Sequence, residues 1–166
     1  MKRMNYSTKF EDPKSFSNRN LQIIVQFYLF ECPVEGKSKR GKTFKELGYV
    51  GIKAFKKLKD ELLATATASL SKNYYPCKKE ELQGNFSKCS TITYPDEYCV
   101  FLQSDEKSII RSLFSAIRNA FAHGSFNVQS YNHTRIYYFS NYDGYEKARI
   151  VLHENTLLSW IRIIKG

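Results

Sequence analysis

Apolar side chains recur at helical spacing in four stretches of the chain. Residues 18–31 and 44–70 carry an apolar residue every three or four positions, which predicts two amphipathic helices. Residues 106–122 repeat the pattern, with Ile110, Phe114 and Phe121 on one face, and residues 156–165 predict a short final helix. The pattern therefore predicts a predominantly helical protein.

Cap and breaker residues set the expected helix ends. Pro33 and Gly36 end the first helix, and Gly48 and Gly51 weaken the first turns of the second, which allows a later start. The remaining expected signals are Ser104 or Asp105 as the cap of the third helix, Glu106 in its first turn, Gly124 after its end, and Asn155 as the cap of the last helix.

The period changes to two after residue 124. Residues 135–141 and 147–152 predict two strands, joined at Asp143-Gly144. Residues 98–102 predict a short strand or a helical turn, and residues 71–97 predict a loop with short elements. We therefore expect one domain, residues 1–166, that is mainly α: a bundle of four to five helices with a β-hairpin before the C-terminal helix.

The balance of charge favours a polyanionic partner. The 166 residues include 26 Lys and Arg against 16 Asp and Glu, a net charge of +10. Nucleic acid and an anionic membrane both fit, as does a basic surface without such a partner. No apolar stretch is long enough to span a membrane, and residues 1–20 carry no apolar signal core. We expect a cytoplasmic protein with no membrane partner.

The four cysteines show no CxxC pair, which is typical of reduced thiols. A zinc site from Cys77, Cys89 and Cys99 is an alternative, but their spacing matches no common zinc pattern. We expect neither a metal nor a cofactor.

The segment Arg118-Asn119-Ala120-Phe121-Ala122-His123-Gly124 combines a phosphate-binding and a proton-transferring side chain where a helix should end. Residues four apart share a helix face, so His123 and Asn119 extend a polar row that includes Arg111 and Ser115. The alternative is a solvated face on which His123 only interacts with the helix dipole.

Arg118-Asn119-x-x-x-His123, late in a helix, resembles the R-x4-6-H motif of HEPN domains. The resemblance implies an α-helical domain that dimerises and acts as a metal-independent endoribonuclease, in many cases as a toxin or in defence against phage. An antitoxin or regulatory protein would then be a partner. The HEPN variant with Tyr two residues after the His is not matched, because this position is Ser125.

RNA cleavage by its own 2′-OH needs a base, an acid and positive charge beside the phosphate. His123 can transfer the proton, Arg118 can supply charge, and Asn119 can orient either group. One His cannot be base and acid in the same pass, so we expect a homodimer with two motifs and 2′,3′-cyclic phosphate products. The alternative is a non-catalytic module that binds RNA or a protein.

A basic loop provides a second candidate site. Gly36-x4-Gly41-Lys42-Thr43 matches the phosphate-loop pattern of ATP and GTP enzymes, but no strand is predicted before it. We instead expect the loop either to hold RNA phosphates, through Lys37, Lys39, Arg40 and Lys42, or to be merely solvated.

Weaker candidates lie near the predicted hairpin. Its aromatic residues could stack on bases, although packing of one hairpin face on the bundle explains them as well. These are Tyr137, Tyr138, Phe139, Tyr142 and Tyr145, with Arg135, Lys147 and Arg149 nearby. We expect His133 and His153 to be structural or surface residues.

Overall fold

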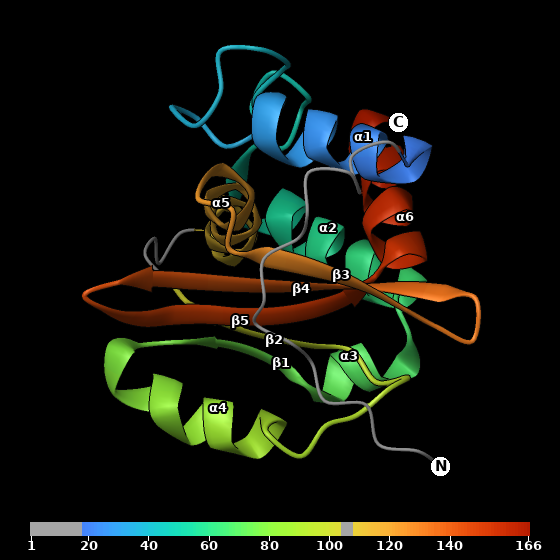
Figure 1. Cartoon of the computed structure of the whole chain (residues 1–166). Helices are drawn as coiled ribbons and strands as arrows, with labels where there is room; N and C mark the ends of the chain where they lie inside the picture. Colours follow the sequence, from blue (N-terminus) through green and yellow to red (C-terminus); the bar gives the residue numbers. More distant parts are fainter. Residues whose placement is uncertain (1–17, 104–107) are drawn as a thin grey trace.

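A five-stranded mixed sheet organises the chain (Figure 1). The computed structural model describes residues 18–103 and 108–166. Four helices, α1, α2, α5 and α6, lie on one face of the sheet, and α4 lies on the other (Figure 1). The described chain therefore forms three layers, with the sheet in the middle.

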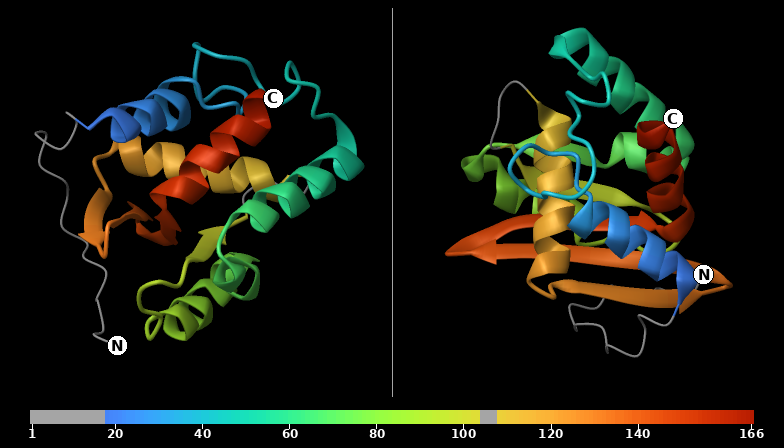
Figure 2. Two further views of the ribbon diagram at one scale, coloured as in Figure 1. Left: turned by 90° about the vertical axis from the view of Figure 1, so that its right-hand side faces the viewer. Right: turned by 90° about the horizontal axis from the view of Figure 1, so that it is seen from above.

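The helical segments occur in two groups along the chain. The first group precedes the first strand and consists of α1 (Arg19–Val25), which continues as the π-helix η2 (Gln26–Phe30), then α2 (Gly51–Thr65) and α3 (Ala68–Lys72). Later come the 3₁₀ helix η3 (Lys79–Glu81), α4 (Leu82–Cys89), α5 (Ile109–Ala122) and α6 (Glu154–Lys165). Figure 2 shows α5 and α6 crossing the same face of the sheet.

The sheet has the strand order β1-β2-β5-β4-β3. Its strands are β1 (Tyr74–Cys77), β2 (Tyr98–Leu102), β3 (Phe126–Tyr131), β4 (Thr134–Asp143) and β5 (Tyr145–His153). The pair β1–β2 is parallel and the other three pairs are antiparallel. Pro76 lies in β1, at the edge of the sheet, where its missing N–H costs no ladder bond.

The larger core lies between the sheet and the four-helix layer. Tyr28 stacks on Phe114 with ring centroids 5.6 Å apart, and its hydroxyl donates to the Leu157 carbonyl at 2.7 Å. The Trp160 indole donates to the Leu62 carbonyl at 2.9 Å. These buried polar ends are paired, so the aromatic rings join η2, α2, α5 and α6 without an unsatisfied donor.

A smaller core fills the opposite face beneath α4. Phe86 and Leu82 of α4 pack with Val100, Tyr138 and Val151 of the sheet. The Arg149 guanidinium lies 4.5 Å from the centre of the Phe86 ring and pairs with the Glu146 carboxylate. The sheet is thus apolar on both faces along its centre, which is why its strands alternate less clearly than those of a one-sided sheet.

The expected fold class, a mainly α HEPN-like bundle of four to five helices with a β-hairpin, is wrong because the chain has this five-stranded mixed sheet. The predicted hairpin exists as β4 and β5, with Gly144 at φ +74° in the turn. It is the centre of a sheet, because β2 pairs with its one edge and β3 with its other. Residues 98–102 take the strand alternative.

Helix boundaries depart from the sequence expectations in three places. The predicted helix 44–70 begins only at Gly51 and breaks after Thr65, so α3 is separate. Helix α6 begins at Glu154, with His153 rather than Asn155 at its cap position. The expected cap signals Ser104, Asp105 and Glu106 lie outside the described residues, and Ser108 caps α5 by accepting the Arg111 N–H.

Candidate functional site

The predicted polar row lies along the half-exposed side of α5. Arg111, Ser115 and Asn119 are half-buried, and His123 is exposed. The His123 N–H still bonds to the Asn119 carbonyl at 3.0 Å, and Gly124 turns the chain with φ +66°. The helix therefore ends where the sequence predicted, and its end presents the His123 ring to solvent.

Arg118 is half-buried beside the row and contacts its neighbour. Its Nη1 donates to Asn119 Oδ1 at 3.2 Å. Its Nε is buried and has no hydrogen-bond partner within the described part of the chain. This bond uses the amide oxygen of Asn119 as the acceptor, which leaves its amide nitrogen as the group that can donate to a ligand.

Asn119 and His123 line a hollow of about 390 Å³ between the end of α5 and the β4–β5 hairpin. Asn141 of β4 holds the two elements together, because its Nδ2 donates to the Ala116 carbonyl at 2.9 Å. The other lining residues are Ser125, Tyr142, Asp143 and Lys147. The lining is mainly polar side chains, and it does not include Arg118.

Lys147 brings positive charge to this hollow. Its Nζ lies 3.4 Å from Asp143 Oδ2 and 5.3 Å from the centre of the Tyr145 ring. The carboxylate of Asp143 is exposed, so this ion pair is weak and water or a ligand can replace it. An anion that enters the hollow can therefore meet Lys147 and His123 together.

Cys32 lies near both Arg118 and the basic loop. Burial raises the pKa of its thiol to about 11, while the charges of Arg118 and Lys37 act in the opposite direction. Both cations therefore lie close enough to act on one buried sulfur atom. The Cys32 thiol is thus under the influence of one cation of the basic loop and of the arginine of the helix end.

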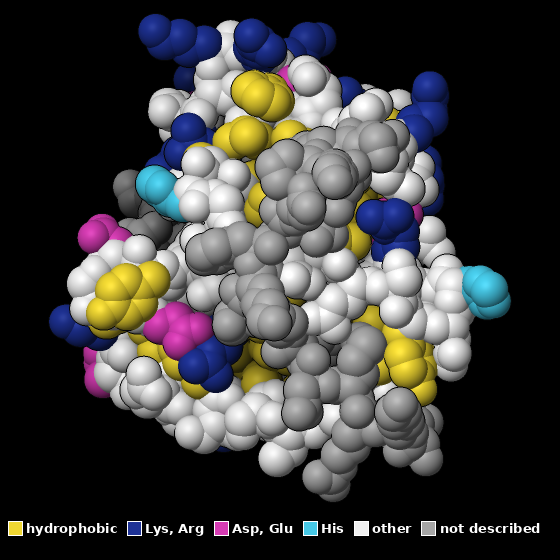
Figure 3. Space-filling view, viewed as in Figure 1, with side chains coloured by type: hydrophobic (Ala, Val, Ile, Leu, Met, Phe, Trp, Pro, Cys, Tyr) yellow, Lys and Arg dark blue, Asp and Glu magenta, His cyan; other side chains and the backbone are white. Residues whose placement is uncertain are grey.

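The loop between η2 and α2 is anchored to the core. Phe44 is buried and packs on Phe114 with ring centroids 5.5 Å apart. Arg40 lies 5.3 Å from the centre of the Phe30 ring. Lys39, Arg40 and Lys42 are exposed and Lys37 is half-buried, and none of the four lines the hollow. Lys and Arg side chains gather along this edge of the molecule (Figure 3).

The phosphate-loop alternative lacks the backbone that it requires. Helical residues of η2 precede Gly36, and α2 begins only at Gly51, eight residues after Thr43. A phosphate loop joins a strand directly to a helix whose amino end faces the phosphates. The segment has no strand directly before it and no helix directly after it, so it matches the phosphate-loop pattern in sequence but not in structure.

The weaker candidates separate by burial. Tyr137, Tyr138 and Phe139 are buried, whereas Tyr142 is 74% exposed at the hairpin end. His133 lies in the β3–β4 turn, and the His153 ring bonds to the Pro95 carbonyl through Nε2 at 2.8 Å. Tyr142 is therefore the one member of the aromatic group that lines the hollow.

The sequence predicted no role in a site for Ser125, Asn141 or Asp143. Asn141 and Asp143 belong to a strand end and a turn, where polar residues are ordinary. Only the packing of β4 on α5 brings them to His123. No local sequence pattern predicted that this hairpin packs against the end of α5.

The cysteines are free and buried at Cys32, Cys77, Cys89 and Cys99. Across residues 18–103 and 108–166, no three His, Cys, Asp or Glu side chains come together as a group that could hold a metal ion. The zinc alternative from Cys77, Cys89 and Cys99 therefore has no site among these residues.

Within the described ranges, every helix is too short or too polar to cross a membrane. Compared with models of known protein families, with characterised proteins and with solved structures, the chain matches none.

Proposed function

We propose that this protein is a metal-independent endoribonuclease whose reaction takes place in the hollow at the end of α5. The observation that carries the proposal is that His123, Asn119 and Lys147 line one polar hollow, with Arg118 bonded to Asn119 at its side. The net charge of +10 suits a polyanionic substrate. The proposal rests on these residues and not on the HEPN bundle.

In the proposed reaction the ribose 2′-OH attacks the adjacent phosphorus. A new O2′–P bond forms as the P–O5′ bond breaks, His123 takes the 2′-OH proton, and a second acid gives a proton to O5′. The products are a 2′,3′-cyclic phosphate and a 5′-OH. Lys147, which lines the hollow, offsets the negative charge that builds on the phosphate oxygens, and Arg118 adds positive charge from its place beside Asn119.

The second acid is expected to come from a second copy of the chain. His133 and His153 lie outside the hollow, so the other described histidines cannot serve it. A symmetric dimer with two hollows facing each other supplies two copies of His123. Light scattering should therefore give twice the 19.4 kDa mass of the chain, and a monomer that cleaves RNA would contradict this part.

Tyr142 and the basic loop would hold the RNA. An exposed aromatic ring beside a phosphate site offers a stacking surface for an unpaired base. Lys39, Arg40 and Lys42 are exposed and can follow the backbone. The free thiols favour a reducing compartment such as the cytoplasm, where a toxin or anti-phage role would need a regulatory protein to restrain the nuclease.

The test compares wild type with His123→Ala on a mixed-sequence RNA in EDTA, followed by end-group analysis of the fragments. Cleavage by wild type alone, leaving cyclic phosphates, supports the proposal. His133→Asn is the matched control, because His133 is also exposed, and Asn tolerates its φ of +64°. Equal cleavage by wild type and His123→Ala refutes the role of His123.

A second candidate function is RNA binding without cleavage, and the exposure of Tyr142 favours it. A wild-type protein that binds RNA, loses affinity in Tyr142→Ala and leaves the RNA whole would select this function. A wild-type protein that binds another protein but no RNA would instead support a non-catalytic protein-binding module.

A further inference from the structure

Like α6, α2 lacks the side-chain cap that α1 and α5 have, but α6 at least carries Glu154 in its first turn. Val50 occupies the N-cap position of α2, no side chain caps this helix, and its first turn contains no acidic residue. By contrast, Asn18 caps α1 and Ser108 caps α5 through side-chain oxygens. A 15-residue helix therefore begins without a side chain of its own, at the cap position or in the first turn, that could accept its first backbone N–H groups.

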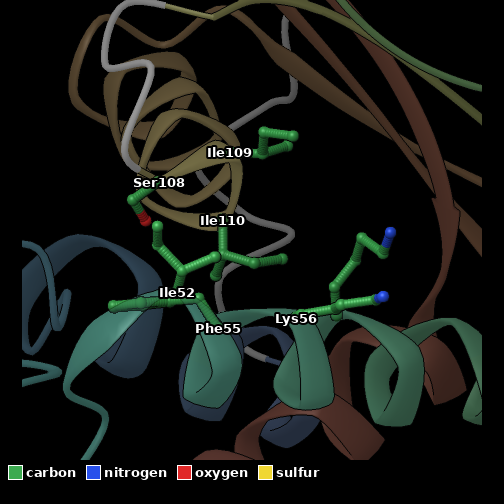
Figure 4. A pocket seen from close by; sticks show the side chains of 7 residues that line it. Ile52, Phe55, Lys56, Ser108, Ile109 and Ile110 are labelled. Carbon is green, nitrogen blue, oxygen red and sulfur yellow. The ribbon is translucent and has the colours of Figure 1, made fainter.

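Apolar side chains project from the same end of α2. Val50 is 65% exposed and Ile52 is 77% exposed. Single exposed apolar residues are ordinary, but Ile52 lines a groove of about 460 Å³. Figure 4 shows the groove between the start of α2, with Ile52 and Phe55, and the start of α5, with Ile109 and Ile110.

Lysines border the apolar groove. Lys56 and Lys59 line it, and Lys53 lies one turn nearer the start of α2. The acidic residues of α2 pair with Lys57 and Lys59, and no ion pair to Lys53 or Lys56 occurs within the described residues. The positive end of the helix dipole adds to this charge.

We propose that this groove binds an acidic, amphipathic segment of a partner protein. Apolar side chains of the segment would pack between Ile52, Phe55 and Ile110. A carboxylate at its end would accept hydrogen bonds from the uncapped N–H groups at the start of α2, and further acids would lie beside Lys53 and Lys56. This one occupant accounts for the missing cap, the exposed Ile52 and the two lysines that have no ion pair among the described residues.

RNA fits this groove less well than an acidic protein segment does. Phosphates would satisfy the lysines, but RNA offers no aliphatic side chains for Ile52, Ile109 and Ile110. The groove also lies at the opposite end of α5 from His123. A 14-residue helix spans about 20 Å, so a partner here leaves the proposed RNA hollow open.

The test uses fluorescence anisotropy with the full chain and a labelled synthetic peptide of about 14 residues, leucine on one face and glutamate on the other. A scrambled peptide of the same composition and a lysine-for-glutamate peptide are the controls. We expect only the first peptide to bind. Equal binding of the scrambled peptide, or no binding of the amphipathic one, overturns the proposal.

Val50→Asp is the decisive variant. It gives α2 a cap of its own, so it should raise the urea midpoint of unfolding while weakening peptide binding by about tenfold. Ile52→Asn should weaken binding to a similar degree without unfolding the chain. Ile23→Asp changes an exposed apolar residue of α1, outside the groove, and should leave affinity within about twofold.

The outcomes separate this site from the proposed nuclease. Loss of RNA cleavage in His123→Ala with unchanged peptide binding leaves the groove proposal standing. Displacement of the peptide by an RNA oligonucleotide, dependent on Ile52, would overturn it in favour of nucleic acid. Equal affinity of wild type, Val50→Asp and Ile52→Asn would overturn it as well.

Discussion

Removal of the Glu97 carboxylate should destabilise the whole fold. Glu97 is fully buried just before β2. Its Oε1 accepts the Thr67 N–H at 2.8 Å and the Thr67 hydroxyl at 2.7 Å, and its Oε2 accepts the His153 N–H at 2.8 Å. One carboxylate thus joins the α2–α3 junction to the β5–α6 junction, two points that no strand pairing connects.

The size of the effect follows from these three donors. Glu97→Ala leaves the partly buried N–H groups of Thr67 and His153 without their acceptor, at roughly 1–3 kcal/mol each. The Thr67 hydroxyl adds little, because it can rotate toward Ser69. We therefore expect the free energy of unfolding to fall by about 3–5 kcal/mol. At a urea m-value of about 2 kcal/mol/M, the midpoint should fall by roughly 2 M.

Urea unfolding followed by fluorescence of Trp160, the single tryptophan and a fully buried one, measures this shift. Glu97→Gln keeps an oxygen acceptor but places an amide NH₂ against one donor, so its loss should be intermediate. Glu80→Ala, at an exposed carboxylate, should change stability by less than about 0.5 kcal/mol. A Glu97→Ala midpoint within about 0.5 M of wild type, at unchanged m-value, would refute the reasoning.

Three further predictions concern other parts of the molecule. Burial raises the pKa of the Cys32 thiol from 9.0 to about 11, so between these pH values the thiol loses its proton in the unfolded chain but keeps it in the folded one. The free energy of unfolding should therefore fall as the pH rises from 9 toward 11. Urea midpoints across that range check this, and a flat profile would contradict it. Gly41→Ala places a Cβ 2.8 Å from the Glu31 Cβ at φ +73°, so the free energy of unfolding should fall by about 2–3 kcal/mol. Gly36→Ala is the control, because its Cβ meets nothing within 4 Å and it should cost only about 1 kcal/mol. Urea unfolding compares the two, and equal losses would rule out the clash. If the proposed nuclease is correct, Arg118→Lys should keep RNA affinity but cleave about 10- to 100-fold more slowly, and undiminished cleavage would exclude a bidentate role.

Local signals in the sequence were enough for several elements. The apolar spacing of residues 18–31 predicted a helix that the structure forms as α1 and η2, with Asn18 as its cap. Asp143-Gly144 predicted the turn between β4 and β5. These features depend on neighbours a few residues apart, so the sequence pattern is sufficient for them.

The sheet could not be read in the same way. Strand β1 has four residues and contains Pro76, and it becomes a strand only by pairing with β2, about 25 residues later. In strand β3 the alternation of apolar and polar residues lasts only from Phe126 to Gln129, which is too short to show that a third strand extends the hairpin. Pairing of this kind is decided by partners far along the chain, so a hairpin in isolation was the most that the local pattern indicated.

In the proposed site, too, some features follow from local sequence and others from tertiary packing. The sequence by itself determined that Asn119 and His123 share a helix face and that Gly124 ends the helix beside them. Only the tertiary structure decided that Asn141 and Lys147 meet them, because the hairpin reaches α5 through the bond from Asn141 to the Ala116 carbonyl. Helical spacing is set within one turn of backbone, whereas a hollow between a helix and a hairpin exists only once both pack on a common core.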